Sequence, residues 1–434
     1  MRFGSDAFLR LSALSASASA LLSLNDQQPL TSSLGAIPSS EDSAYRVPLL
    51  TLHRDLVNIP SISGSEADVT LFLEKALTRL NFTVTLQPLP KTATNPAARF
   101  NVIAWPGRDD HTPPAGFHDR VLITSHIDVV PPFIPYALHS TRIPPHQPLN
   151  FTDLHPSTLI SGRGTVDAKG SVAAQITAAA LLLRSGSIPP HSIALLYVVG
   201  EEVDGDGMKY FSSSLQHSSA SSPTRHHQKL KAAIFGEPTE GKLACGHKGI
   251  ALAAVVATGK AGHSGYPWLG KSATAVLVRG LGGLLDAELG SSERFGNTTV
   301  NVGVLEGGVA ANVIAKEARA RLAVRVALGD RRTGAEIVGG RMRSVLEEVD
   351  SEALRLEFGG GYGPVECECD VDGFETMVAN YGTDVPNLEG DHVSYLYGPG
   401  SILVAHGDDE GLTIKDLEDA VEGYKRLIKH AVEA

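Results

Sequence analysis

The chain is poor in cysteine, in aromatic residues and in positive charge, and it lacks a long apolar run. Without about 18 consecutive apolar residues we expect no membrane-spanning helix. A formal net charge of −11 disfavours nucleic acid as a partner, because phosphate binding requires clustered Lys and Arg. Three cysteines leave at least one unpaired in a monomer, so no disulfide framework is implied.

What the chain does have is a globular composition and the length for two domains. Hydrophobic residues make up 42% and charged residues 20% of its 434 residues, which argues against disorder. A chain of this length exceeds the usual size of a single core. We expect a leader over residues 1–45, a main domain in two parts, 46–245 and 363–434, and an inserted domain over residues 246–362.

The first residues resemble a secretory signal. Arg2 and Arg10 accompany a weakly apolar, Ser/Ala-rich run from Phe8 to Leu24, a pattern typical of exported proteins. Because serines interrupt this run, an intracellular start remains the alternative. Three Asn-x-Ser/Thr sequons are candidate glycosylation sites of a secreted protein: Asn81, Asn150 and Asn297.

Strand-like and helix-like segments alternate up to residue 245. Apolar runs occupy residues 84–86, 101–104, 121–124, 193–199 and 232–235, and helical patterns occupy residues 49–80, in two pieces, and 171–183. This alternation predicts an α/β fold with a mainly parallel sheet flanked by helices on both faces. In such sheets, ligands bind beyond the carboxyl ends of the strands.

The inserted segment has a different pattern, in the order strand, helix, strand, strand, helix, strand. These elements are expected at residues 251–256, 272–285, 300–304, 320–326, 333–349 and 354–358. The order predicts a compact α+β sandwich. The glycines at 359–361 lack the helix and the Lys-Ser/Thr of a phosphate loop, so we interpret them as a linker. An apolar strand over 401–406 and a helix over 414–432 then return to the first pattern.

Histidine and carboxylate residues stand at or near the ends of apolar runs. Seven residues share this placement: His126, Asp128, Asp167, Glu201, Glu202, Glu237 and His406. Imidazole and carboxylate groups are the donor types with which a zinc site begins. Taken alone, His126 is better explained as a structural histidine, and the Glu201–Glu202 pair as a solvated acidic turn. The ordered series instead indicates a metal centre.

Five motifs carry a family resemblance. They are Ser125–Asp128, Gly164-x-x-Asp167-x-Lys169-Gly170, Gly200–Glu202, Gly236–Thr239 and Ala405–His406. In this order they resemble the co-catalytic zinc metallopeptidase family of acetylornithine deacetylase, succinyl-diaminopimelate desuccinylase, aminoacylase and glutamate carboxypeptidase. The resemblance covers nearly all of the chain after Tyr45 and is greatest to secreted fungal carboxypeptidase-like members. It implies a zinc exopeptidase-like sheet with an inserted lid and dimerisation domain.

The resemblance also implies two zinc ions per subunit. Because two cations a few ångström apart repel, a carboxylate must bridge them, and Asp167 fits that role. His126 and Glu237 would complete the shell of one ion, and Glu202 and His406 that of the other.

Other roles follow from the same resemblance. Asp128 would accept the free N–H of His126 and fix its tautomer. Glu201 would take a proton from the water that the zinc ions activate and pass it to the leaving amine. His263, unless it belongs to a plain turn, would reach into the active site of a homodimer partner and stabilise the oxyanion.

Three residues are expected to contact substrate. Asn312 would face it from the lid, and Thr383 lies in a segment that resembles a substrate-contact loop of the family. Arg325 would pair with a free carboxylate through its planar fork, although an outward ion pair on a strand would explain it equally well.

The function expected first is a secreted zinc carboxypeptidase that acts on peptides. A deacylase that acts on N-acyl amino acids such as acetylornithine is the second reading, because it uses the same metal chemistry. An inactive binding scaffold is the third, and it is disfavoured because Glu201 and every ligand position are filled. The chain departs from its relatives at Ala168, where many carry Met or Asp, and in a long segment from Pro131 to Leu159.

Overall fold

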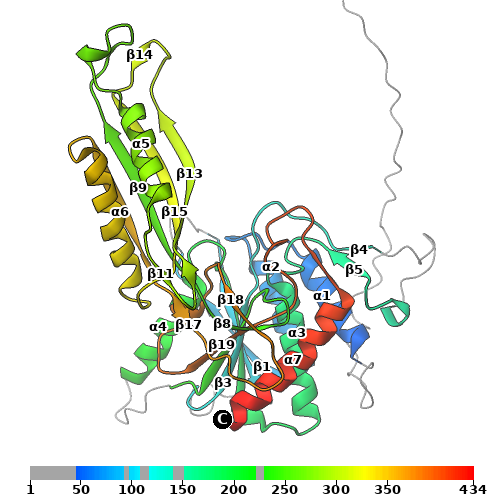
Figure 1. The fold of residues 1–434 in the computed structure, drawn as a ribbon. Helices are drawn as coiled ribbons and strands as arrows, with labels where there is room; N and C mark the ends of the chain where they lie inside the picture. The colour runs from blue at the N-terminus through cyan, green and yellow to red at the C-terminus, as the bar shows by residue number, and fades with distance from the viewer. Residues whose placement is uncertain (1–44, 92–96, 108–116, 140–150, 221–228) are drawn as a thin grey trace, which may run out of the picture.

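The computed structural model describes residues 45–91, 97–107, 117–139, 151–220 and 229–434 (Figure 1). The expected signal sequence, like the sequon at Asn150, lies outside these residues. Among the helices of the described part, none combines the length and the apolar character needed to cross a bilayer.

A nine-stranded sheet forms the centre of the larger body, with the order β1-β2-β6-β3-β7-β19-β8-β17 and β18 beside β8. Its strands are β1 (Phe82–Pro88), β2 (Phe100–Pro106), β3 (Val121–His126), β6 (Ile193–Val198), β7 (Ala232–Gly236), β8 (Leu243–His247), β17 (Val365–Glu366), β18 (Thr376–Ala379) and β19 (Val393–Tyr397). The four central strands, β6, β3, β7 and β19, run parallel. Their carboxyl ends therefore meet at one edge of the sheet, as the α/β prediction requires.

Alternate residues of the central strands enter two different cores. Ile123 and Leu195 pack into the core under four helices, α1 (Arg46–Asn58), α2 (Ala67–Arg79), α3 (Lys169–Arg184) and α7 (Ile414–Glu433). Leu122 and Leu196 pack on the opposite face against α4 (Asp206–Ala220). Because strands covered on both faces have no polar side, they are apolar throughout. The predicted layer of helices on each face is confirmed.

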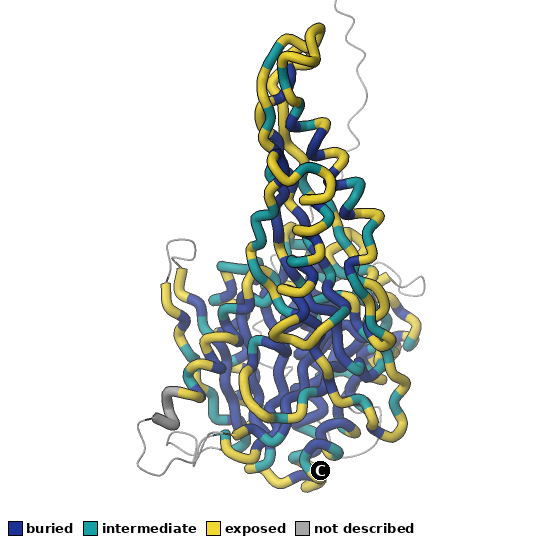
Figure 2. Tube along the Cα trace, turned by 60° about the vertical axis from the view of Figure 1, so that its left-hand side comes forward, coloured by how far each residue is buried: buried dark blue, intermediate teal, exposed yellow. Residues whose placement is uncertain are grey.

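The second body, which we call the lid, comprises residues 249–362 and projects from the main sheet (Figures 1 and 2). Four antiparallel strands pair in the order β13-β15-β9-β16, with α5 and α6 over one face and a core of their own. Their bounds are β9 (Gly249–Thr258), α5 (Ala273–Asp286), β13 (Thr299–Gly307), β15 (Glu317–Val326), α6 (Gly334–Asp350) and β16 (Leu354–Tyr362). The predicted order of strands and helices is confirmed.

Short elements complete the fold. A three-stranded sheet combines β4 (Ala137–His139), β5 (Leu159–Ser161) and β20 (Gly411–Thr413). At the lid tip, β10 (Gly262–His263) pairs with β14 (Val313–Ile314), and nearer its base β11 (Ser291–Ser292) pairs with β12 (Gly296–Asn297). Four 3-10 helices are η1 (Phe151–Asp153), η2 (Pro190–Ser192), η3 (Pro267–Leu269) and η4 (Val385–Asn387).

Two expectations about local structure were wrong. The strand expected at residues 401–406 does not form: residues 402–406 form turns, and Leu403 is 86% exposed. The glycines at 359–361 belong to β16, where they accompany a break in its pairing with β9.

Cys245 and Cys369 form a disulfide across 124 residues, while Cys367 stays free and buried. Spacing along the chain does not reveal a pairing this distant.

Candidate metal centre

Seven of the predicted site residues meet at the carboxyl edge of the main sheet. Strand β3 ends at His126, and the loop after β6 carries Glu201 and Glu202. Glu237 follows β7, and Asp167 stands two residues before α3 with a cis peptide bond to Ala168. The turns between β19 and β20 bring His406, and Asp128 lies just beyond β3. Parallel strands whose ends share an edge thus bring together residues far apart in the chain.

Asp167 lies between the two histidines. Its Oδ1 is 2.9 Å from Nε2 of His126, and its Oδ2 is 3.3 Å from Nε2 of His406. His406 Nε2 is also 2.9 Å from Oε2 of Glu202. A carboxylate that turns one oxygen to each imidazole is arranged as a bridging ligand must be.

The possible metal ligands form two overlapping groups, and within each group the ligand atoms all lie within 4.8 Å of one another. They are His126 with Glu201 and Glu237, and His126 with Asp167 and Glu202. The five predicted ligands and Glu201 therefore form one cluster, since His406 joins it through Asp167 and Glu202.

The cluster carries more negative than positive charge. Burial and repulsion from Glu237 raise the pKa of Glu201 well above its usual range, and burial raises the pKa of Glu237 as well. Hydrogen bonds to Asp167 and Glu202 raise the pKa of His406 to about 10. Glu202 Oε1 is buried without a hydrogen-bond partner in the described part of the chain. Because buried carboxylates without cationic partners are costly, this donor set fits bound divalent cations.

Asp128 holds the loop that carries the two glutamates. Its Oδ1 accepts the backbone N–H of Glu201 at 3.2 Å, and its Oδ2 accepts that of Glu202 at 3.3 Å. The Ser63 hydroxyl donates to Oδ2 at 2.7 Å. His126 Nδ1 is 3.0 Å from the carbonyl oxygen of Asp128 and 3.6 Å from its Oδ1. The main-chain carbonyl is therefore the closer acceptor for this imidazole, and the carboxylate mainly orders the glutamate loop.

A cavity of about 480 Å³ opens in front of the cluster. Arg325 and Thr383 line it, as do Lys209, Tyr362 and Tyr381, which were not predicted. Nothing in the sequence distinguishes these tyrosines from core residues. The glycines at 359–361 also line the cavity, so a segment interpreted as a linker belongs to its wall.

Two of the predicted residues are elsewhere. His263 and Asn312 are exposed at the lid tip, where the Ser264 N–H donates to the Asn312 carbonyl at 3.1 Å, and neither lines the cavity. The sequon residues Asn81, after α2, and Asn297, in β12, are exposed.

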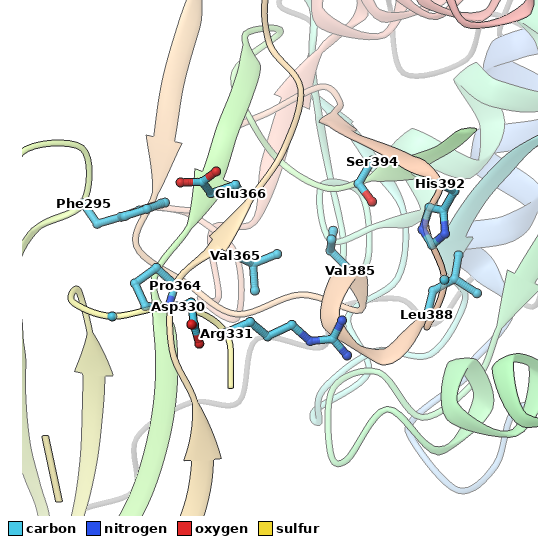
Figure 3. A pocket seen from close by; sticks show the side chains of 12 residues that line it. Phe295, Asp330, Arg331, Pro364, Val365, Glu366, Val385, Leu388, His392 and Ser394 are labelled. Atoms are coloured by element: carbon cyan, nitrogen blue, oxygen red, sulfur yellow. The ribbon is translucent and has the colours of Figure 1, made fainter. Parts of the chain in front are cut away.

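A second cavity, of about 420 Å³, lies where the lid joins the main body (Figure 3). Phe295 and Arg331 line it from the lid side, and Val385 and His392 line it from the main body. The groups of possible metal ligands found among the described residues are all at the first cavity. The first cavity is therefore the candidate active site.

Known proteins share both the sequence and the fold. A peptidase dimerisation domain model matches residues 245–347. A peptidase M20 domain-containing protein of Sordaria macrospora is 55% identical, with 93% of this chain and 89% of that protein covered. A probable carboxypeptidase of Neosartorya fischeri is 47% identical, with 91% and 89% covered.

Two solved structures illustrate the fold. A tripeptidase from Staphylococcus aureus superposes with a TM-score of 0.68 at 20% identity, covering 89% of this chain and 98% of that one. A dinuclear metal binding peptidase from the M20 family, from Bacillus subtilis, gives a TM-score of 0.55 at 16% identity, covering 90% and 98%. The resemblance inferred from the ordered motifs is confirmed, and the chain belongs to the M20 peptidase family.

Proposed function

We propose that this M20 hydrolase is a zinc-dependent carboxypeptidase that releases the C-terminal residue of peptides. One observation carries the proposal: the cavity that contains the carboxylate and histidine cluster also contains Arg325. Within the described residues, the Arg325 guanidinium has no hydrogen bond or ion pair of its own. An unpaired guanidinium beside a hydrolytic centre is suited to a free carboxylate. Fungal relatives named probable carboxypeptidases support the same reading.

Two zinc ions fit the donor set. Asp167 would contact both, His126 and Glu237 would complete the shell of one, and Glu202 and His406 that of the other. When bound, the ions would polarise the scissile carbonyl and lower the pKa of a water molecule toward about 7.

The chain's own residues would orient the reactants and move the proton. The Glu201 carboxylate would accept a proton from the attacking water and deliver it to the leaving nitrogen. Asp128 would keep Glu201 in place, because its carboxylate already accepts the N–H groups of Glu201 and Glu202. Glu201 is partly buried in the wall of the cavity, where both a water molecule and the substrate can reach its carboxylate.

Arg325 would fix the end of the substrate. A Cβ on Gly382 would lie 2.7 Å from the Tyr362 hydroxyl and 4.0 Å from Nη1 of Arg325, so glycine there leaves these groups accessible. Thr383 follows Gly382 and is buried, with its hydroxyl 3.1 Å from Nε2 of His247. A carboxylate paired with Arg325 would place the last peptide bond of the substrate toward the ligand cluster.

The active enzyme would be a homodimer. His263 is exposed at the lid tip and does not line the cavity of its own subunit. A second copy that docks through the matched dimerisation domain would bring its His263 and Asn312 to the cavity and complete it.

We also propose that the protein is secreted. The disulfide between Cys245 and Cys369 supports this, since such bonds persist in oxidising compartments. Two exposed sequon residues, Asn81 and Asn297, agree with it. Recovery of glycosidase-sensitive protein from culture medium would support export, and retention of unglycosylated protein inside the cell would refute it.

The activity is tested with matched substrates. Zinc-reloaded protein is incubated with short peptides that have a free or an amidated C-terminus and with N-acetyl amino acids, and the released amino acids are identified by mass. A carboxypeptidase releases C-terminal residues from the free peptides only, and chelation abolishes the release. Release only from N-acetyl amino acids would show a deacylase, and release from neither would show a scaffold.

A further inference from the structure

A buried ion pair lies behind the ligand cluster. Arg163 Nη1 is 2.8 Å from Oε2 of Glu410, and both side chains are 1% exposed. Neither residue belongs to the proposed ligand set or lines the cavity. Burying two charges is costly unless further hydrogen bonds satisfy them, so their other contacts indicate what the pair holds.

Glu410 holds the segment that carries Asp167. Its Oε1 accepts three backbone N–H groups, from Gly164 at 2.9 Å, Val166 at 3.0 Å and Asp167 at 3.2 Å. A carboxylate that accepts three N–H groups of one turn fixes the backbone of that turn. Glu410 therefore fixes the backbone position from which the Asp167 side chain extends.

Arg163 holds the turn that carries His406. Its Nη2 donates to the His406 carbonyl at 3.2 Å, and its Nη1 donates to the Gly407 carbonyl at 3.0 Å. His406 has a φ of 64°, a backbone conformation that costs energy for a residue other than glycine. The side chain of His406 is 51% exposed, so packing does little to keep it in place.

The two proposed metal positions differ in how their ligands are supported. His126 is the last residue of β3, where it pairs with Val198 of β6, and it is 1% exposed. Glu237 follows β7 directly and is 6% exposed. The backbone bonds of Val404, Ala405 and Gly407 are instead local to their own turns. The position with Glu202 and His406 thus depends on a turn that Arg163 ties to the core.

We propose that Arg163 and Glu410 are positioning residues that set the spacing between Asp167 and His406, and that Arg163, through the turn that carries His406, selectively supports the metal position formed by Glu202 and His406. This rests on the proposed two-zinc site. The outer position, formed by Glu202 and His406, is then the weaker of the two. Supporting residues of this kind typically change metal affinity about 10–100-fold when replaced.

The test replaces the guanidinium but keeps the charge. Arg163→Lys can neutralise Glu410 but cannot also reach both carbonyls in the geometry of the planar fork. We expect titration of the metal-free variant with zinc to show one site of unchanged affinity and one weakened about 10–100-fold. The kcat at fixed zinc should fall while KM for the peptide stays near that of the wild type, and excess zinc should restore kcat.

Arg46→Lys is the matched control. Arg46 also forms a two-pronged pair with a glutamate, Glu418, and donates to a carbonyl, that of Leu154, at 3.2 Å. None of these partners carries a proposed ligand, so both zinc affinities should be unchanged. Glu410→Gln, which keeps the shape of the side chain, is the second variant if Arg163→Lys does not fold.

Two outcomes overturn the proposal: both zinc sites unchanged in Arg163→Lys and in Glu410→Gln, or both sites weakened equally in Arg163→Lys. A wild type that binds two zinc ions yet hydrolyses no peptide would refute the proposed activity, and the zinc titration would still decide the positioning role. A wild type that binds no zinc would overturn both.

Discussion

The carboxyl edge of the main sheet and the tip of the lid both carry residues with proposed catalytic roles, in opposite physical settings. At the sheet edge, His126 and Asp167 are buried and bonded to each other. At the tip, His263 is exposed, and its Nδ1 accepts only the N–H of Gly265, two residues away. In Figure 2 the interior of the main body is largely buried, whereas the tip of the lid is mostly exposed.

The difference indicates which catalytic groups already have their working geometry within a single chain. Groups fixed by strand pairing and buried hydrogen bonds are preorganised, whereas an exposed loop gains its geometry only when another surface covers it. The tip also exposes Tyr266 to 52% and Trp268 to 74%, and the centroids of their rings are 5.5 Å apart. Large exposed apolar side chains that lie together are typical of interaction surfaces. The sheet edge should therefore bind metal in each subunit alone, and the tip should act across a dimer.

The largest effect is expected at the sheet edge. Replacing Glu201 by Gln removes the group that moves the proton, so kcat should fall by about 10²- to 10⁴-fold. Zinc content, measured by mass spectrometry of the intact complex, should not change if Glu201 is a base. Because Glu201 lies within ligand distance of His126 and Glu237, loss of zinc would instead make it a ligand. The exposed Glu347 on α6 provides the control variant, Glu347→Gln.

The lid tip is tested by mixing two inactive proteins. The His263→Ala variant should have a much lower kcat than the wild type and an unchanged zinc content. Equal amounts of His263→Ala and Glu201→Gln subunits, dissociated and reassembled, should recover about a quarter of wild-type activity, since half the dimers are mixed and each has one intact site. Recovery near zero, with mixed dimers shown by mass, would contradict a role for His263 across the dimer.

The sheet edge could be predicted because His126, Glu202 and Glu237 stand at or just after apolar runs. Buried parallel strands are apolar throughout, so the runs that end at His126 and before Glu201 could be located from composition alone. The prediction of a strand at residues 401–406, next to His406, was wrong for the same reason. The apolar residues from Ile402 to Val404 have a strand-like pattern but lie in turns beyond the sheet, and of the three only Leu403 is exposed.

The support behind the ligands could not be predicted. Arg163 and Glu410 are 247 residues apart, and a buried charged pair has no periodicity or spacing that marks it. The cavity wall posed a similar problem, since Tyr362 follows a glycine run whose place in β16 becomes evident only when β9 pairs beside it. These contacts arise from tertiary packing, which brings together segments with no local relation.

Arg325 lies at the base of the lid, between the two regions, and its replacement should have a smaller effect on activity than the two changes above. Arg325→Lys keeps the charge but loses the planar fork, so KM for free peptides should rise about tenfold or more while kcat changes less. Arg321→Lys is a matched control, because Arg321 lies on the same strand and face of β15, outside the cavity. An equal rise in KM for both variants would remove Arg325 from carboxylate recognition.

The smallest effect concerns stability in acid, which should affect the main body before the lid. Burial lowers the pKa of His53 and of His247 to about 4, and both lie outside the lid. Each takes up its proton near pH 4 when folded but near 6.5 when unfolded, so the unfolded chain binds more protons between these values. Acidification from about pH 6.5 to 4 should therefore lower the contribution of each histidine to the free energy of unfolding, by at most about 3 kcal/mol.

Denaturant unfolding of the chelated protein, followed across this pH range, measures the loss. The chelator matters because acid also releases metal from imidazole and carboxylate ligands. His53→Gln can still donate to the Thr165 carbonyl, which His53 Nε2 approaches to 3.1 Å, and it does not titrate, so its profile should be flatter. The exposed His191 serves as the control in His191→Gln, which should follow the wild type. If hydrogen exchange shows the lid losing protection first as the pH falls, acid sensitivity does not arise from these buried histidines, and the contrast between the two regions fails at this point.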